Sequence, residues 1–144
     1  MRLFLFCCCL SLTFSNYSCK KYTPTNLPAE QIHFGEGGGF TGAVIEFCLL
    51  ENGQLMRKKD FLAKFAPFKK VKKKVAKECF QMGHEIPFET MELNNPGDRY
   101  YFIQWKTDAI DKRITWGRPN TDIPKSVATF YQQLKSLTKI EKSK

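Results

Sequence analysis

Residues 42–59 read GAVIEFCLLENGQLMRKK, and this stretch decides the fold of the chain. A strand-like apolar run leads into the dipeptide Asn52-Gly53, and a second strand-like run, QLMRKK, follows it. Asn-Gly between two such runs is a strong hairpin signal, because the tight turn requires positive φ at its central residues. The stretch therefore predicts two antiparallel strands joined by a short turn.

Alternation along the first of these strands also places two cysteines. Ile45, Phe47 and Leu49 would face the core, which puts Cys48 on the opposite face. Cys79 falls on the apolar stripe of the helix expected next, and that stripe should face the core. Cysteines on opposite sides of one sheet cannot approach within the ~7 Å of Cα separation that a disulfide needs. We therefore expect Cys48 and Cys79 to be unpaired.

Further elements follow on the C-terminal side of the hairpin. A helix is expected over residues 68–82, and Gly83 should end it. Residues 87–93 have the pattern of a short edge strand. Residues 99–107 and 112–117 predict a second hairpin.

The last helix completes the predicted domain. It should begin near Pro124, because proline is favoured at a first helical position. Apolar residues then recur with helical spacing, which is typical of an amphipathic helix. Hairpins and helices in this order predict an α+β domain, with an antiparallel sheet of about four to five strands and two helices packed on one face. The apolar stripe of the last helix consists of Val127, Phe130, Tyr131, Leu134 and Leu137.

The N-terminus has the composition of an export signal. Arg2 precedes an apolar run of twelve residues, 3–14, which is too short to span a bilayer but fits the ~7–15 residues of a signal-peptide core. Ser18 then stands directly before Cys19, and this pair after an apolar run resembles a bacterial lipobox. The resemblance implies cleavage between Ser18 and Cys19 and acylation of Cys19, with palmitate as a typical acyl chain.

The chain then divides into three parts. Residues 1–18 are the expected signal peptide, residues 19–31 the lipidated cysteine and a tether, and residues 32–144 a single domain. The tether carries two prolines and no hydrophobic periodicity. Asn16 stands where a lipobox usually has leucine, which leaves a secreted or soluble periplasmic protein as the alternative.

The mature chain is strongly basic. The 144 residues carry 23 Lys and Arg against 14 Asp and Glu, a formal net charge of +9. Much of the excess lies between Arg57 and Lys77, where the expected helix would carry it. Such a run is either a solvated helix face or a contact with an anionic membrane surface, which attracts lysine by up to ~1 kcal/mol per side chain. Export and the lack of a nucleic-acid motif exclude nucleic acid as the partner. The candidate contact residues are Lys69, Lys70, Lys72, Lys73, Lys74 and Lys77.

The glycine-rich segment FGEGGGFTG spans residues 34–42. Gly37, Gly39 and Gly42 satisfy the spacing G-x-G-x-x-G of dinucleotide-binding proteins. That fingerprint binds phosphate only when a helix follows it, and here a strand follows. We expect a bulged or flexible entry into the strand, with a backbone-lined binding loop as the alternative.

Residues suited to catalysis are few and scattered. The two histidines, His33 and His84, have no fixed spacing to cysteine or carboxylate, so we expect no metal, no cofactor and no catalytic residue. If carboxylates converge in the fold, the alternative is a small envelope enzyme that uses them as general acids or bases. A cleft in which Glu36, Glu46 or Glu89 lies beside His33 would favour this enzyme.

The second hairpin concentrates aromatic residues. Alternation places Tyr101, Ile103 and Trp105 on one face, which we expect to be core. The other face is a ligand face if no helix covers it, and an ordinary second core face if one does. The candidate ligand face consists of Tyr100, Phe102 and Arg113.

Several of these segments together resemble a known group. The lipobox-like start, GEGGGFTGAVIEFCLLENGQL, NNPGDRYYFI, ITWG and the last helix resemble small lipoproteins of Bacteroidota that have no assigned function. The resemblance covers roughly residues 31–138 and implies an envelope location and a compact domain, but no site residues. In those bacteria, acidic residues after the lipidated cysteine accompany surface export. Lys20 and Lys21 stand there in this chain, which favours the periplasmic side of the outer membrane.

These observations favour a non-enzymatic function. We expect a monomeric, lipid-anchored domain that binds an envelope protein, a glycan or an anionic lipid. The alternatives are a small envelope enzyme that uses carboxylates and a secreted binding protein without a lipid.

Overall fold

The computed structural model describes residues 21–60 and 63–140. The predicted signal peptide and Cys19 lie outside these residues. Within them, no helix is long and apolar enough to cross a membrane.

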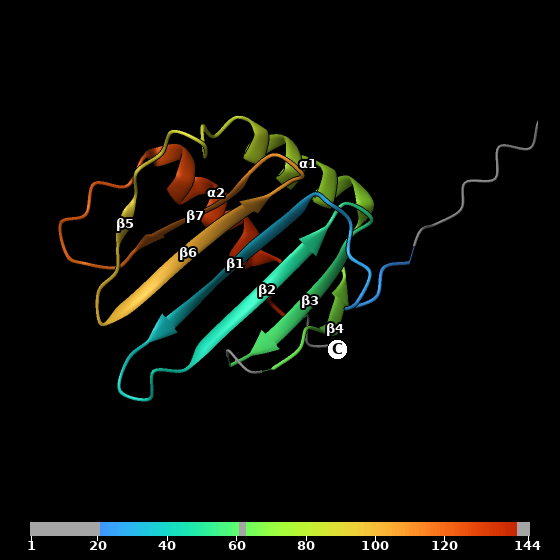
Figure 1. The fold of residues 1–144 in the computed structure, drawn as a ribbon, viewed down its shortest axis with the longest axis horizontal. Helices are drawn as coiled ribbons and strands as arrows, with labels where there is room; N and C mark the ends of the chain where they lie inside the picture. The colour runs from blue at the N-terminus through green and yellow to red at the C-terminus, as the bar shows by residue number, and fades with distance from the viewer. Residues whose placement is uncertain (1–20, 61–62, 141–144) are drawn as a thin grey trace, which may run out of the picture.

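One sheet with two helices makes up the described part of the chain (Figure 1). The strand order is β4-β3-β2-β1-β6-β7-β5, and every pair of neighbours is antiparallel except β5 and β7, which are parallel. The α+β class is therefore confirmed, but the sheet has seven strands and is mixed. The strands are β1 (Gln31–Gly38), β2 (Val44–Leu50), β3 (Gln54–Lys59), β4 (Ala66–Lys70), β5 (Asn94–Asn95), β6 (Arg99–Lys106) and β7 (Asp111–Trp116), and the helices are α1 (Lys73–His84) and α2 (Lys125–Ser136).

The central strand β1 is the main departure from the sequence prediction. The expected bulged entry is in fact a regular strand paired along its length with β2 on one side and β6 on the other. Its glycines are required by packing: a Cβ on Gly35 would lie 2.9 Å from the ring of Phe102, and a Cβ on Gly37 would lie 2.6 Å from the ring of Tyr100. Aromatic side chains of β6 therefore lie across β1, and a strand that is weak by propensity is stabilised by its neighbour.

The helix predicted over residues 68–82 begins later. Phe68 and the two lysines after it belong to β4, which pairs with β3. The N–H of Val71 donates to the carbonyl of Gly53 (2.8 Å), so the chain is still extended beside the β2–β3 turn before α1 starts. Gly83 lies within the last turn of α1, where a Cβ would be 2.0 Å from the ring of Trp105. The edge strand predicted over residues 87–93 is wrong, because none of these residues is in a strand and the two-residue strand β5 begins only at Asn94.

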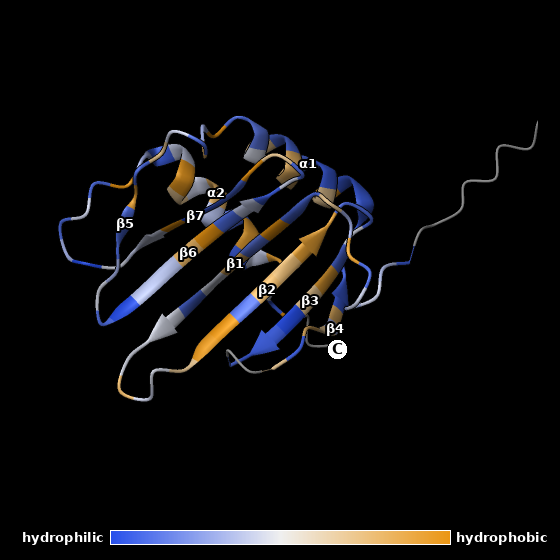
Figure 2. Ribbon diagram, in the orientation of Figure 1, coloured by the Kyte–Doolittle hydropathy of each residue, from blue (hydrophilic) through white to orange (hydrophobic). Residues whose placement is uncertain are grey.

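The main core lies between the sheet and the two helices. It includes Phe34, Leu49 and Ile103 from the strands, and Phe130 and Leu134 from α2. Both helices therefore cover the same face of the sheet, as predicted. Hydrophobic residues recur along β2 and β6, whereas β3 ends in hydrophilic residues (Figure 2). The second hairpin and the apolar stripe of α2 are also confirmed.

A second, smaller cluster lies on the opposite face of the sheet. Its buried members are Cys48, Leu50 and Met56, and Tyr22 and Leu27 pack against it. Two residues of the segment predicted to be a tether, Tyr22 and Leu27, are therefore packed on the domain.

The two cysteines lie where alternation placed them. Cys48 belongs to the second cluster and Cys79 to the main core, so the sheet separates them. Both are free.

Candidate functional site

The helix-free face of the sheet carries the polar and charged residues that sequence analysis singled out. Tyr100 and Phe102 lie on this face of β6, and Ile103 and Trp105 face the helices, as alternation predicted. Arg113 of β7 joins them, because β6 and β7 pair in antiparallel register with Phe102 opposite Thr115. The structure therefore brings the three predicted ligand-face residues to one side of the sheet.

Arg113 is stacked on Phe102. The guanidinium carbon lies 3.6 Å from the centroid of the ring, which is close contact for a cation–π pair. Phe102 is 0% exposed and lies against Gly35 on its other side. The expectation that Phe102 is itself a ligand contact is therefore wrong: its ring is covered, and it supports the guanidinium above it.

The donor edge of Arg113 has no protein partner among the described residues. Its side chain is exposed and borders a shallow pocket of about 340 Å³ that Met91, Leu93 and Thr115 also line. The neighbouring Lys112 differs, because its Nζ lies 2.9 Å from the carboxylate of Glu92. A flat guanidinium with free N–H groups is suited to bidentate binding of a carboxylate or phosphate.

A buried polar cluster that the sequence analysis did not predict crosses the same face. Nδ1 of His33 lies 2.9 Å from Oε1 of Glu46, and Nε2 of His33 lies 2.9 Å from Oε1 of Gln31. Nζ of Lys58 lies 3.0 Å from the other carboxylate oxygen of Glu46. His33 and Glu46 are only 8% and 7% exposed. The cluster joins β1, β2 and β3. Its side chains meet because of the register between these strands, and the sequence does not predict the register of β1.

Hydrogen bonding determines the charges in this cluster. The amide nitrogen of Gln31 donates to the carbonyl of Pro28 (2.6 Å), so its Oε1 is the atom that faces His33. Both ring nitrogens of His33 then lie within hydrogen-bond distance of oxygen atoms. Burial raises the pKa of Glu46, but hydrogen bonds from His33 and Lys58 outweigh it, and the net pKa is lowered. The contacts with His33 and Lys58 therefore favour the ionised form of the Glu46 carboxylate.

Cys48, His33 and Glu46 lie in a row, which is the arrangement of a thiol nucleophile, its base and an orienting carboxylate. Its Sγ lies 3.7 Å from Nε2 of His33, whose other nitrogen contacts Glu46. The thiol is nevertheless 0% exposed, and burial raises its pKa to about 12. The ring of Phe65 packs edge-on against His33 and helps to cover it. A covered, protonated thiol is not a nucleophile, and the geometry does not support thiol catalysis.

The three carboxylates whose clustering with His33 would favour an enzyme do not share a cleft with it. Glu46 does contact His33, but in the interior of the domain. Glu36 is exposed and pairs with Lys135 (2.9 Å) toward α2, and Glu89 is exposed elsewhere. Among the described residues, no group of three metal-ligating side chains is placed to hold a metal ion.

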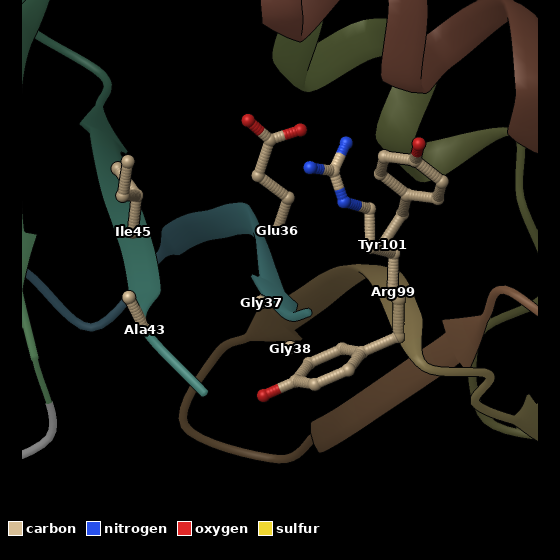
Figure 3. A pocket seen from close by; sticks show the side chains of 8 residues that line it. Glu36, Gly37, Gly38, Ala43, Ile45, Arg99 and Tyr101 are labelled. Atoms are coloured by element: carbon tan, nitrogen blue, oxygen red, sulfur yellow. The ribbon is translucent and has the colours of Figure 1, made fainter. Parts of the chain in front are cut away.

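The glycine-rich turn between β1 and β2 borders a small pocket of about 210 Å³ (Figure 3). Gly37 and Gly38 form its floor, and the side chains of Glu36 and Arg99 extend into the same space beside Tyr101 (Figure 3). Because strand, turn and strand follow one another here, no helix N-terminus is available for a phosphate. The backbone-lined loop considered from sequence therefore exists, but it has no phosphate-binding geometry.

The six candidate lysines are divided between two elements. Lys69 and Lys70 lie on β4, and the others precede or lie within α1. The expectation that most of them share one helix is therefore correct only from Lys73 onward. Lys69, Lys70 and Lys72 border one groove, and α1 with the other three lysines begins directly after Lys72. We call the surface of these six lysines the lysine end.

Comparison with known proteins adds no further constraint. No family model matches this chain, and no curated protein is significantly similar to it. The function has to be inferred from the site itself.

Proposed function

We propose that this chain is a lipid-anchored protein of the bacterial cell envelope with a non-enzymatic binding domain. Export and the acyl anchor at Cys19 are supported by the N-terminal sequence. Lys20 and Lys21 directly after Cys19 favour the periplasmic side of the outer membrane. The observation that carries the binding function is Arg113, which is held flat on Phe102 with its donor edge free.

The chemistry around Arg113 favours an acidic segment of an envelope protein as the partner. The guanidinium would take a carboxylate, and Met91 and Leu93 offer an apolar surface in the adjoining pocket. Arginine, methionine and aromatic residues are enriched where proteins meet. A glycan is less well served, because the ring of Phe102 is covered and offers no open face on which a sugar could stack.

Replacement of Arg113 tests this function. The full-length protein is expressed in a bacterium, and its neighbours are cross-linked in intact cells and identified by mass spectrometry. We expect Arg113→Gln to lose the specific partner, because one charge and a bidentate contact are removed. Arg118→Gln is the matched control, since it removes the same charge from an exposed arginine beyond the end of β7.

The outcomes separate the candidate partners. A protein captured by the wild type and by Arg118→Gln, but not by Arg113→Gln, supports the proposal. Capture that is equal in all three proteins would show that Arg113 is not the binding residue. A captured glycan that depends on Arg113 would replace the protein partner with a saccharide.

A further inference from the structure

The N-terminal segment is fastened to the domain at Tyr22. The N–H of Tyr22 donates to Oε1 of Gln54 (2.8 Å), and Nε2 of Gln54 donates to the carbonyl of Tyr22 (2.9 Å). The Tyr22 side chain and Leu27 then pack against the second hydrophobic cluster. We call this pair of hydrogen bonds the clasp. The described fold therefore holds the chain only three residues after Cys19.

This spacing limits how far the domain can move from an anchor at Cys19. Three residues of fully extended chain span at most about 11 Å. An acyl chain on Cys19 would keep that residue at the bilayer surface, so the clasp would also stay close to that surface. The end of the domain that carries the clasp would then face the membrane.

The lysine end lies beside the clasp. Nζ of Lys70 donates to the carbonyl of Asn52 (2.7 Å), which ties the end of β4 to the β2–β3 turn. Gln54 of the clasp lines a shallow pocket of about 290 Å³ together with Lys69 and Lys70. Gln54 also pairs with Lys70 across β3 and β4, so Tyr22 lies near the end of β4 (Figure 1). An anchor at Cys19 and the lysines would therefore meet the membrane on the same side.

The charge of this end is one-sided. Lys70, Lys72 and the lysines of α1 are exposed, and the first turn of α1 contains no acidic residue. Glu51 in the β2–β3 turn and Glu78 on α1 oppose six lysines. Anionic lipid attracts such clusters, and one lipid anchor combined with a polybasic patch is a stable arrangement.

An apolar surface adjoins the lysines. A groove of about 620 Å³ runs between β4, the start of α1 and the end of α2, with Phe68, Val71 and Leu137 among its lining residues. Ile140 at its border is 75% exposed, although large apolar side chains are seldom so exposed. Basic residues around an apolar surface are suited to the headgroup region of a bilayer.

We propose that the lysine end is a membrane-docking surface that lies on anionic phospholipid headgroups and is held there by the clasp. This orientation rests on the anchor at Cys19 proposed above. Arg113 would then lie across the sheet from the contact, because β7 is the third strand beyond β2.

Proximity to the bilayer tests the orientation. Full-length protein is purified from bacterial membranes and reconstituted into vesicles that contain a headgroup spin-labelled lipid. Lys73→Cys and, separately, Arg118→Cys each carry a fluorophore, and the native Cys48 and Cys79 are buried and escape labelling. In vesicles with phosphatidylglycerol at 0.01 M salt, we expect strong quenching at position 73 and weak quenching at position 118. We call the difference between the quenching at position 73 and the quenching at position 118 the excess quenching. It should be lost in neutral vesicles and weakened at 0.15 M salt, because the Debye length falls from ~30 Å at 0.01 M to ~8 Å at 0.15 M.

Three further variants separate the effect of charge from the effect of the clasp. Lys70→Gln combined with Lys77→Gln should abolish the excess quenching at position 73. Lys59→Gln combined with Arg99→Gln removes the same charge from the opposite end of the strands and should leave the excess unchanged. Gln54→Ala keeps the charge but removes both hydrogen bonds of the clasp, and it should reduce the excess by lengthening the free link.

Each adverse outcome contradicts a specific part of the proposal. Mass spectrometry of the N-terminal peptide first determines whether Cys19 is acylated. Without an acyl chain, the anchor is wrong and the docking orientation is wrong with it. If the protein is acylated but positions 73 and 118 are quenched equally, the docking is wrong and the anchor stands. If Gln54→Ala has no effect while the lysine variants do, charge alone orients the domain and the role of the clasp is wrong.

Discussion

At the scale of single residues, the glycines of β1 and the aromatic side chains of β6 explain one another. Gly35 and Gly37 leave space on the helix-free face for the rings of Phe102 and Tyr100. Phe102 in turn supports Arg113 at 3.6 Å. Gly35 therefore leaves room for the buried ring against which Arg113 packs.

The two free thiols give a prediction at the same scale. Burial raises the pKa of Cys48 to about 12 and that of Cys79 to about 11, so both should react slowly with a thiol reagent in the folded domain. After unfolding without reductant, both should react completely, which mass spectrometry of the labelled peptides would show. Blocked thiols in the unfolded protein would instead demonstrate a disulfide and contradict the separation of the two residues by the sheet.

At the scale of the elements, the buried cluster fastens β1, β2 and β3 to one another. The lowered pKa of Glu46 means that its ionised form stabilises the fold. This contribution is complete above the ordinary value of 4.5 and is lost as the pH falls through the lower pKa of the folded state. Protonation of Glu46 should therefore lower the free energy of unfolding as the pH falls below 4.5.

Glu46→Gln tests that dependence. At pH 7 the variant should lose about 2 kcal/mol of unfolding free energy, because hydrogen bonds to a buried charge are replaced by neutral ones. The difference from wild type should shrink as the pH falls through the lowered pKa of Glu46 in the folded state, because wild-type Glu46 then becomes protonated as well. Urea unfolding at several pH values measures both effects. Glu92→Gln is the control: its pair with Lys112 is exposed, so it should hardly change stability at any of these pH values.

At the scale of the whole molecule, the proposed anchor at Cys19 and the proposed docking of the lysine end would together decide how the domain is presented. Expressed in a bacterium, the wild-type protein should incorporate a fatty-acid probe and partition into detergent. Cys19→Ala should do neither, because the acyl acceptor is missing. Continued labelling of Cys19→Ala would contradict acylation at this residue, and an unlabelled wild type would favour the secreted alternative.

The sequence by itself determined the features that depend on neighbours in the chain. Turn chemistry at Asn52-Gly53 and alternation on either side predicted the first hairpin, and the same alternation placed Cys48 and Cys79 on opposite faces. Helical spacing predicted α2 over residues 125–136. These signals are local, because side-chain periodicity and turn geometry are properties of a few successive residues.

Only the tertiary structure decided the features that depend on distant partners. The segment 31–38 became the central strand because β2 and β6 supply its hydrogen bonds and Phe102 supplies the packing that glycine lacks. Tyr22 joined the domain through Gln54, which is 32 residues away. His33 met Glu46 through strand register alone. Such contacts form between residues that local patterns do not link, since the free energy that favours them comes from pairing and burial in the assembled sheet.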